Sequence, residues 1–205
     1  TELRRAIEAE KLTLAFQPLV DLSTGAISGF EALTRWDHEE EGPIAPAEFI
    51  AVAEESGLIV PLGRWALNAA LDALKQWDEK YGETLPVYVG VNLSAVQIQR
   101  DDVTALVSEA LAGRGIDGRR LMLEVTESAI ITDPARATEV LEEMQRLNVR
   151  IALDDFGTGY TSLPYLQRLP IDLHKIDGSF VTDMLDDADS TAIVRAVLSL
   201  AGALG

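Results

Sequence analysis

Two adjacent aspartates, Asp154 and Asp155, follow the apolar run 151–153 and precede a segment with two glycines, Gly157 and Gly159. The apolar run predicts a buried strand. Two carboxylates at the end of such a strand repel each other and lose hydration, so packing alone does not explain them. A divalent cation, or a pair of them, would offset both costs, because one carboxylate can bridge two ions. We therefore predict a metal site here, beside a tight or mobile glycine loop.

Composition narrows the choice of metal. The sequence has no cysteine and only two histidines, His38 and His174, which excludes disulfides, thiolate sites and a histidine-rich zinc site. Oxygen ligands favour a hard cation, so we expect Mg²⁺ or Mn²⁺. A cysteine-free chain fits a reducing compartment. We expect a cytoplasmic location, which includes the cytoplasmic part of a membrane-bound protein.

Net charge and hydropathy argue against a protein that binds a nucleic acid polymer and against a membrane-spanning segment. The formal net charge is −17, so we expect no binding of a nucleic acid polymer, which requires a basic patch. A small anionic substrate remains compatible where metals and a few cations reverse the local field. The sequence contains no run of about 18 apolar residues, and residues 1–10 resemble a charged helix rather than a signal peptide.

The elements that must position these residues alternate between strands and helices. We predict strands at 12–22, 27–36, 87–93, 120–126, 149–154 and 171–176. We predict helices at 2–10, 46–56, 60–81, 101–113, 134–147, 162–168 and from 188 to the end, with a polar loop at 37–42. The first two strands form a hairpin, and the repeated strand–helix units that follow favour one α/β barrel over separate domains.

Polar residues lie at the carboxyl end of five successive predicted strands: Glu31, Asn92, Glu124, Asp154 with Asp155, and Lys175. In a barrel of parallel strands these ends meet at one mouth, where active sites lie. Strand periodicity lets each of these side chains point inward while its neighbours face the covering helices. A single polar residue at a strand end would be unremarkable, but the repetition argues against scattered surface residues.

Several motifs resemble the EAL domain family, the cyclic di-GMP phosphodiesterases. They are Gln17-Pro18, Glu31-Ala32-Leu33, Asn92-Leu93-Ser94, Glu124-Val125-Thr126-Glu127, the segment 154–163 and Lys175-Ile176-Asp177. These ordered matches cover nearly the whole chain. The resemblance implies a TIM-like (β/α)8 barrel whose first strand is antiparallel.

The resemblance also implies a role for each matching position. The first metal would be held by Glu31, Asn92, Glu124 and Asp154. The second would be held by Asp154 and Asp155. Lys175 would lie beside the attacking water, and Glu127 would anchor the loop 156–162. The substrate residues would be Gln17, Leu33 and Arg35.

The implied reaction is the hydrolysis of one phosphodiester bond of cyclic di-GMP to linear pGpG, with Lys175 and Arg35 adding positive charge near the phosphate. Simpler explanations exist for three residues. Arg35 could pair with Glu39, Lys175 could be an exposed lysine, and Glu127 could be an acid favoured at a helix N-terminus.

The resemblance covers residues 1–205 as one domain, and we expect this domain to be incomplete at its C-terminus. Barrels of this type run to about 250 residues, so the last two strands and a late-strand glutamate of the family would be missing. A longer chain could carry a flanking sensor or GGDEF domain, and a homodimer is left open. The alternatives to a phosphodiesterase are a non-hydrolysing cyclic di-GMP receptor and an unrelated two-metal hydrolase. Every metal ligand that the resemblance implies within residues 1–205 is intact, which favours the enzyme.

Overall fold

A seven-stranded sheet forms the centre of the molecule, as seen in a computed structural model that describes residues 2–9, 11–82, 87–156 and 168–204. Its strands are β1 (Leu12–Val20), β2 (Ile27–His38), β3 (Gly42–Ile44), β4 (Tyr88–Asn92), β5 (Leu121–Thr126), β6 (Arg150–Phe156) and β7 (Leu173–Ile176). The strand order is β1-β2-β4-β5-β6-β7, and β3 pairs with β2. The pairs β1–β2 and β2–β3 are antiparallel, and all the others are parallel. The predicted α/β sheet with an antiparallel first strand is thus confirmed.

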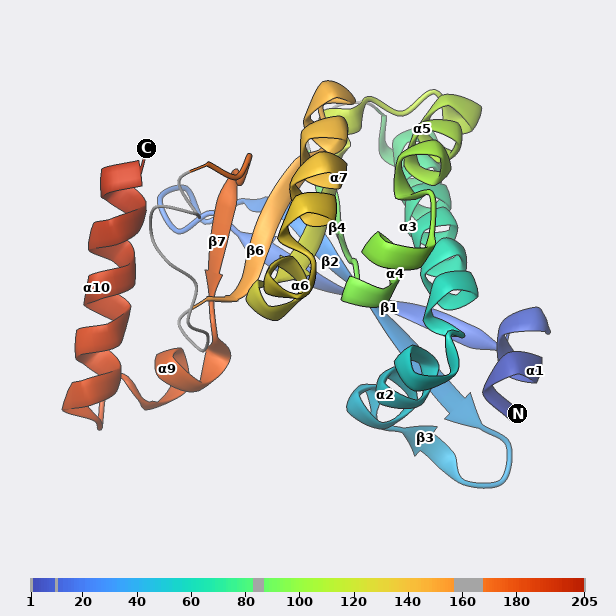
Figure 1. Ribbon diagram of the computed structural model, residues 1–205, viewed down its shortest axis with the longest axis horizontal. Coiled ribbons are helices and arrows are strands. Elements are labelled where there is room, and N and C mark those ends of the chain that lie inside the picture. Colours follow the sequence, from blue (N-terminus) through green and yellow to red (C-terminus); the bar gives the residue numbers. More distant parts are fainter. Residues whose placement is uncertain (1, 10, 83–86, 157–167, 205) are drawn as a thin grey trace.

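Helices connect the strands and cover one face of the sheet. They are α1 (Glu2–Glu8), α2 (Pro46–Ser56), α3 (Ile59–Tyr81), α4 (Ala95–Arg100), α5 (Val103–Arg114), α6 (Glu127–Thr132), α7 (Pro134–Arg146), α9 (Gly178–Asp183) and α10 (Ala188–Leu204), with a 3₁₀ turn at Gly118–Arg120. Helices α3, α5 and α7 lie together on the side of β4, whereas α10 lies beyond β7 (Figure 1). In the described part of the chain, none of the helices combines the length and apolar composition needed to cross a membrane.

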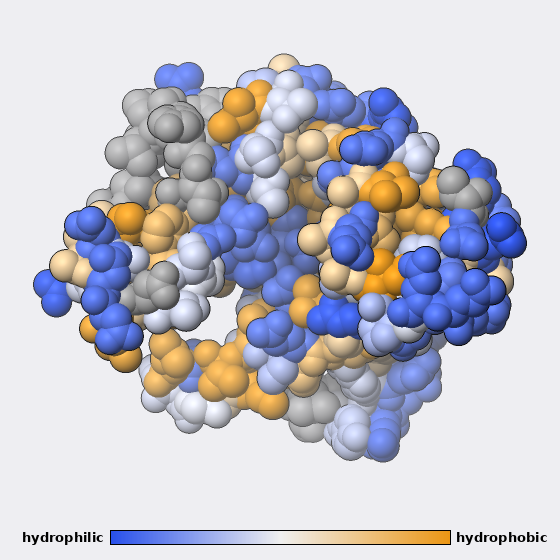
Figure 2. Space-filling model, turned by 90° about the horizontal axis from the view of Figure 1, so that it is seen from below, coloured by the Kyte–Doolittle hydropathy of each residue, from blue (hydrophilic) through white to orange (hydrophobic). Residues whose placement is uncertain are grey.

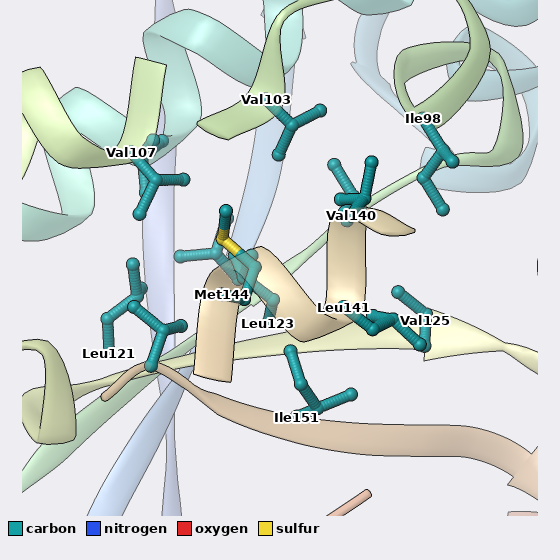
Figure 3. Packing of buried hydrophobic residues seen from close by; sticks show 14 of the residues in the cluster. Ile98, Val103, Val107, Leu121, Leu123, Val125, Val140, Leu141, Met144 and Ile151 are labelled. Atoms are coloured by element: carbon teal, nitrogen blue, oxygen red, sulfur yellow. The ribbon is translucent and has the colours of Figure 1, made fainter. Parts of the chain in front are cut away.

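Helix α7 shows how the sequence builds the core. Asp133 caps its first turn by accepting a hydrogen bond from the Arg136 backbone N–H, and Pro134 occupies the first helical position. Its buried residues follow the helical spacing: Ala137, Val140, Leu141 and Met144. This face packs against the outward residues of β5 and β6, including Leu123 and Ile151 (Figure 3). Full burial of each such aliphatic side chain stabilises the fold by about 1.5–3 kcal/mol.

The parallel register fixes what lies on the opposite face of these strands. Gly90 is paired with Glu31, Asn92 with Glu124, and Thr126 with Asp154. Because side chains alternate along a strand, the buried outward residues of β4 and β5 leave these partners facing inward. The sheet therefore brings its polar residues to one mouth, at the carboxyl ends of the parallel strands.

Three predictions about the elements need correction. Both ends of the predicted polar loop 37–42 belong to strands instead. Strand β2 continues to His38, and His38 pairs with Gly42 of β3. The short helices α4 and α6, which directly follow β4 and β5, were not predicted. Strand β7 begins at Leu173 rather than at residue 171. All but the last residue of the predicted helix 162–168 lies outside the described residues.

Candidate functional site

Side chains from five strands converge on one charged cluster. The prediction that Glu31 ends its strand is wrong, because β2 continues to His38; Glu31 lies instead near the end of the pairing between β2 and β4. The Lys175 ammonium on β7 donates hydrogen bonds to Glu31 Oε2 at 3.1 Å, to Asp154 Oδ2 at 2.9 Å and to Glu124 Oε2. The Asn92 amide donates to the other oxygen of Glu31 at 3.1 Å. The structure thus brings together all five of the positions singled out by the sequence.

Glu124 is the most deeply buried member of this cluster, with only 1% of its surface exposed. Its Oε1 atom has no hydrogen-bond partner in the described part of the chain. Burial raises the pKa of Glu124 to about 7, and the hydrogen bond and charge of Lys175 oppose this shift only in part. Burial also lowers the pKa of Lys175, but contacts with Glu124 and Asp154 outweigh that effect and raise it overall. These contacts therefore favour the charged form of Lys175.

The donor set fits a divalent metal ion. One oxygen each from Glu31, Glu124 and Asp154 can lie within 4.8 Å of the others. Three carboxylates share one ammonium, so the cluster keeps an excess of negative charge, and the unpartnered oxygen of Glu124 can accept another cation. Gly90 leaves room for this oxygen, because a Cβ atom at that position would lie 2.1 Å from it. Hard carboxylate oxygens of this kind are the ligands that Mg²⁺ and Mn²⁺ prefer.

Asp155 lies next to this group but is oriented differently. Its backbone has a φ of 54°, in the left-handed region that non-glycine residues rarely adopt, and its N–H donates to Asp154 Oδ1 at 2.9 Å. Burial, the negative charge of Asp154 and a hydrogen bond with Asp177 raise the pKa of Asp155. In the described residues, Asp154 and not Asp155 joins Glu31 and Glu124.

Glu127 is the first residue of α6 and is 5% exposed. The Thr126 side chain caps this helix by accepting a hydrogen bond from the Ala129 N–H at 3.3 Å. The position at a helix N-terminus agrees with the simpler explanation, in which the helix dipole favours an acid. The loop that Glu127 is predicted to anchor lies, beyond Phe156, outside the described residues.

A groove of about 520 Å³ opens beside the cluster. It is lined by the cluster residues Glu31, Asn92 and Glu124, and by Leu33 and Arg35 of β2. Residues of α2 and α3 form an apolar wall: Pro46, Ile50, Ile59 and Leu62. Figure 2, which views the molecule from below, shows a central hollow with hydrophilic side chains on one side and hydrophobic side chains on the opposite side. A molecule in this groove would contact the carboxylates, a guanidinium and an apolar surface together.

Two predicted substrate residues, Arg35 and Gln17, differ in where they lie relative to the groove. The Arg35 guanidinium donates to the Thr34 carbonyl at 3.0 Å. The alternative pairing of Arg35 with Glu39 is not formed, because Glu39 pairs with Lys11. Gln17 on β1 lies directly opposite Glu31 in the antiparallel register and is exposed, outside the described lining of the groove.

Comparison with known proteins decides the family. The family model described as "EAL domain" matches residues 1–205. The chain belongs to the EAL domain family. The bifunctional diguanylate cyclase/cyclic di-GMP phosphodiesterase MucR of Pseudomonas aeruginosa is 40% identical to this EAL domain over 199 residues, which cover 97% of the chain and 29% of MucR. An uncharacterized signaling protein of Caulobacter vibrioides is 44% identical over 203 residues, covering 99% of the chain and 24% of that protein.

Solved structures agree with the fold. The PaMucR phosphodiesterase in complex with c-di-GMP has a TM-score of 0.93 and 39% identity, covering 99% of this EAL domain and 81% of that chain. The EAL enzyme Bd1971 in its cAMP- and cyclic-di-GMP-bound form has a TM-score of 0.91 and 32% identity, with coverage of 99% and 55%. The predicted TIM-like barrel class is thereby confirmed. The chain spans between 24% and 32% of the length of the curated relatives it matches.

Sequence reasoning missed two features of this EAL domain site. The first is the direct contact of the Lys175 ammonium with three carboxylates, because a lysine at a strand end carries no sequence signal for which groups its ammonium contacts. The second is that Ser94 and Thr126, the N-caps of α4 and α6, line the groove. A signal for the first cap was present: Ser94 and Gln97 have the spacing of a capping box, and both of its hydrogen bonds form.

Proposed function

We propose that this EAL domain hydrolyses one phosphodiester bond of cyclic di-GMP to give linear pGpG, with Mg²⁺ or Mn²⁺ as cofactor. One observation carries the proposal. Three carboxylates share a single ammonium at the end of a groove that also contains Arg35. The similarity to MucR, a named cyclic di-GMP phosphodiesterase, supports this substrate.

The carboxylates of the cluster would bind the metal ions. Glu31, Glu124 and Asp154 would hold one ion, completed by the Asn92 side chain, and Asp154 with Asp155 would serve a second. When bound, the ions supply a nucleophilic water at neutral pH and stabilise charge on the attacking and leaving oxygens. Asp155 does not belong to the group formed by Glu31, Glu124 and Asp154, which suits a ligand for a separate ion.

The other residues bind and orient the substrate. The Arg35 guanidinium would contact a non-bridging phosphate oxygen, for which its paired donors suit it. Leu33 and the apolar wall would cover the nucleotide, with Gln17 beside Glu31 on the neighbouring strand. A water oxygen forms a bond to phosphorus as the P–O3′ bond breaks, and the 3′ oxygen takes up a proton. Lys175 would hold positive charge beside the attacking water, and Glu127 would support the neighbouring loop.

The test is a chromatographic assay of cyclic di-GMP incubated, in Mg²⁺, in Mn²⁺ and in EDTA, with a chain that includes the expected remainder of the barrel. We expect pGpG with either metal and none in EDTA, and no pGpG from Glu124→Gln. Binding of cyclic di-GMP without pGpG under any metal would favour the receptor instead. Equal cleavage of unrelated phosphodiesters would favour a general two-metal hydrolase.

The relatives also suggest a setting for this activity. Because the chain spans only 24% of the Caulobacter signaling protein and 29% of MucR, we propose that it acts within a longer cytoplasmic signalling protein. A flanking sensor or GGDEF domain would then control it. Mass measurement of the protein from its native cells would test this, since a mass matching the 205 residues alone would contradict it.

A further inference from the structure

We infer that Lys175 is a built-in cation that holds the metal ligands together in the metal-free protein and must leave them when a metal binds. Lys175 would thereby set the affinity of the site for its metal. This inference rests on the metal site of the proposed function, and it concerns the loading of that site rather than its chemistry.

The geometry makes Lys175 a competitor for the carboxylate oxygens that an ion would use. The Lys175 ammonium contacts one oxygen from each of three carboxylates, on Glu31, Glu124 and Asp154. These three carboxylates are also the group whose oxygens can converge on an ion. An ion bound by all three at about 2.1 Å, the usual Mg²⁺–oxygen distance, would lie in the space that the ammonium fills. Metal and ammonium therefore compete for these three oxygens.

Charge explains why the cluster needs a cation at all times. Three buried or half-buried carboxylates in contact would repel one another strongly without a counter-ion. Lys175 is itself mostly buried, with 22% of its side chain exposed, and it compensates one negative charge. A divalent ion compensates two, so it fits the charge of the site better. The lysine keeps the ligands in place but is the weaker occupant.

The groove beside the cluster offers space for the displaced Lys175 side chain. Lysine carries its charge on a flexible four-carbon stem, and the groove opens beside Glu31 and Glu124. Once displaced, the ammonium would lie at the edge of the bound ion. This is where positive charge is needed beside a phosphate. Metal binding would therefore also move Lys175 into its proposed catalytic position.

The test compares Lys175→Met with Lys11→Met. Both substitutions remove one positive charge, but Lys175 pairs with the three carboxylates of the cluster whereas Lys11 pairs with the exposed Glu39. Mn²⁺ affinity is read from the electron paramagnetic resonance signal of free Mn²⁺, and melting is followed in EDTA. We expect Lys175→Met to bind Mn²⁺ at least about tenfold more tightly, which corresponds to about 1.4 kcal/mol. We also expect it to melt at a lower temperature without metal, whereas Lys11→Met should match the wild type in Mn²⁺ affinity.

Equal or weaker Mn²⁺ binding by Lys175→Met would overturn the inference while leaving the metal site intact. Failure of the wild type to bind Mn²⁺ would overturn both the inference and the proposed function. These outcomes separate the two claims, because the measurement does not depend on hydrolysis.

A second measurement needs no variant. The sequence has four lysines, Lys11, Lys75, Lys80 and Lys175, so the reductive methylation of each can be followed by mass spectrometry. We expect Lys175 to react most slowly in EDTA and to react several-fold faster in Mg²⁺, with Lys11 and Lys75 unchanged. A Lys175 rate that Mg²⁺ leaves unchanged would contradict the displacement.

Discussion

Two groups of charged side chains in this molecule differ in their ratio of cations to carboxylates. On the outer helices, the Arg114 guanidinium donates to both oxygens of Asp72, at 2.7 and 2.9 Å, so one cation meets one carboxylate. At the mouth of the sheet, the single ammonium of Lys175 meets three carboxylates, and a buried oxygen of Glu124 has no partner in the described residues. The outer pair is complete, whereas the inner cluster lacks positive charge.

This difference separates structural charges from functional ones. A balanced ion pair at the surface stabilises a fold slightly and needs nothing further. A buried excess of carboxylates is costly for folding, so its presence indicates a missing cation. Stoichiometry and burial together, rather than the number of acidic residues, identify the site in a chain of net charge −17.

The largest expected effect comes from breaking the inner cluster. Asp154→Asn removes a ligand that the structure places within the three-carboxylate group. We expect Mg²⁺ or Mn²⁺ to raise the melting temperature of the wild type and to have no effect on this variant, because only a ligand of the folded state stabilises it. Asp72→Asn is the matched control and should keep the full metal response. A metal response that survives in Asp154→Asn would remove Asp154 from the site.

A second prediction separates metal binding from nucleotide binding. Arg35 lines the groove but forms no ion pair among the described residues. We expect Arg35→Ala to weaken cyclic di-GMP binding about tenfold to a hundredfold, the range for losing a hydrogen bond to a charged group. Mn²⁺ affinity should stay within about twofold, since Arg35 holds no ligand. Calorimetry measures both constants, and unchanged nucleotide affinity would count against the assignment.

The pH dependence of stability should have opposite signs in the two regions. The folded-state pKa of Glu124 is raised from 4.5 to about 7, so the folded protein holds a proton that the unfolded chain releases. The contribution of Glu124 should therefore fall as the pH rises from about 4.5 to 7. The hydrogen bond from Arg114 lowers the pKa of Asp72, so its contribution is present above 3.8 and is lost as the pH falls below that value.

Denaturant unfolding of metal-free protein across this pH range tests the contrast. The stability difference between wild type and Glu124→Gln should decrease with rising pH, while that between wild type and Asp72→Asn should not change above about pH 5. A flat difference for Glu124→Gln would show that its carboxyl is not perturbed.

The smallest effect is expected on the outer helices. Arg114→Met removes the guanidinium and its ion pair. This change should lower the free energy of unfolding by about 0.5–1 kcal/mol, as for other partly exposed ion pairs. Metal affinity should not change. Denaturant melts measure the first quantity and Mn²⁺ titration the second, and a change in Mn²⁺ affinity would mean that the two regions are coupled.

Much of the fold could be predicted because periodicity and motif order are local properties of the sequence. The inward-facing positions of Glu31, Asn92 and Glu124 follow from alternation in β2, β4 and β5. Helices α4 and α6 were missed because six residues are too few to show a helical period. Strand β3 was missed because three residues with a central proline show no alternation, and its pairing with β2 depends on the turn between them.

The site could be predicted in its composition but not in its contacts. Sequence identified the carboxylates and Lys175, because each is a polar residue within or at the end of a predicted apolar strand. It could not show that one ammonium contacts three of these carboxylates, since that depends on the register of β2, β5, β6 and β7 and on the room that Gly90 leaves. It assigned Asp154 to both metals and Asp155 to the second only, and the structure groups Asp154, not Asp155, with Glu31 and Glu124.

The most direct test is an anomalous-scattering map of crystals of the protein soaked in Mn²⁺. We predict a peak about 2.1 Å from carboxylate oxygens of Glu31, Glu124 and Asp154, with the Lys175 ammonium displaced from them. A map with no peak at this position, and with Lys175 still in contact with all three carboxylates, would contradict the assignment of this cluster as a metal centre.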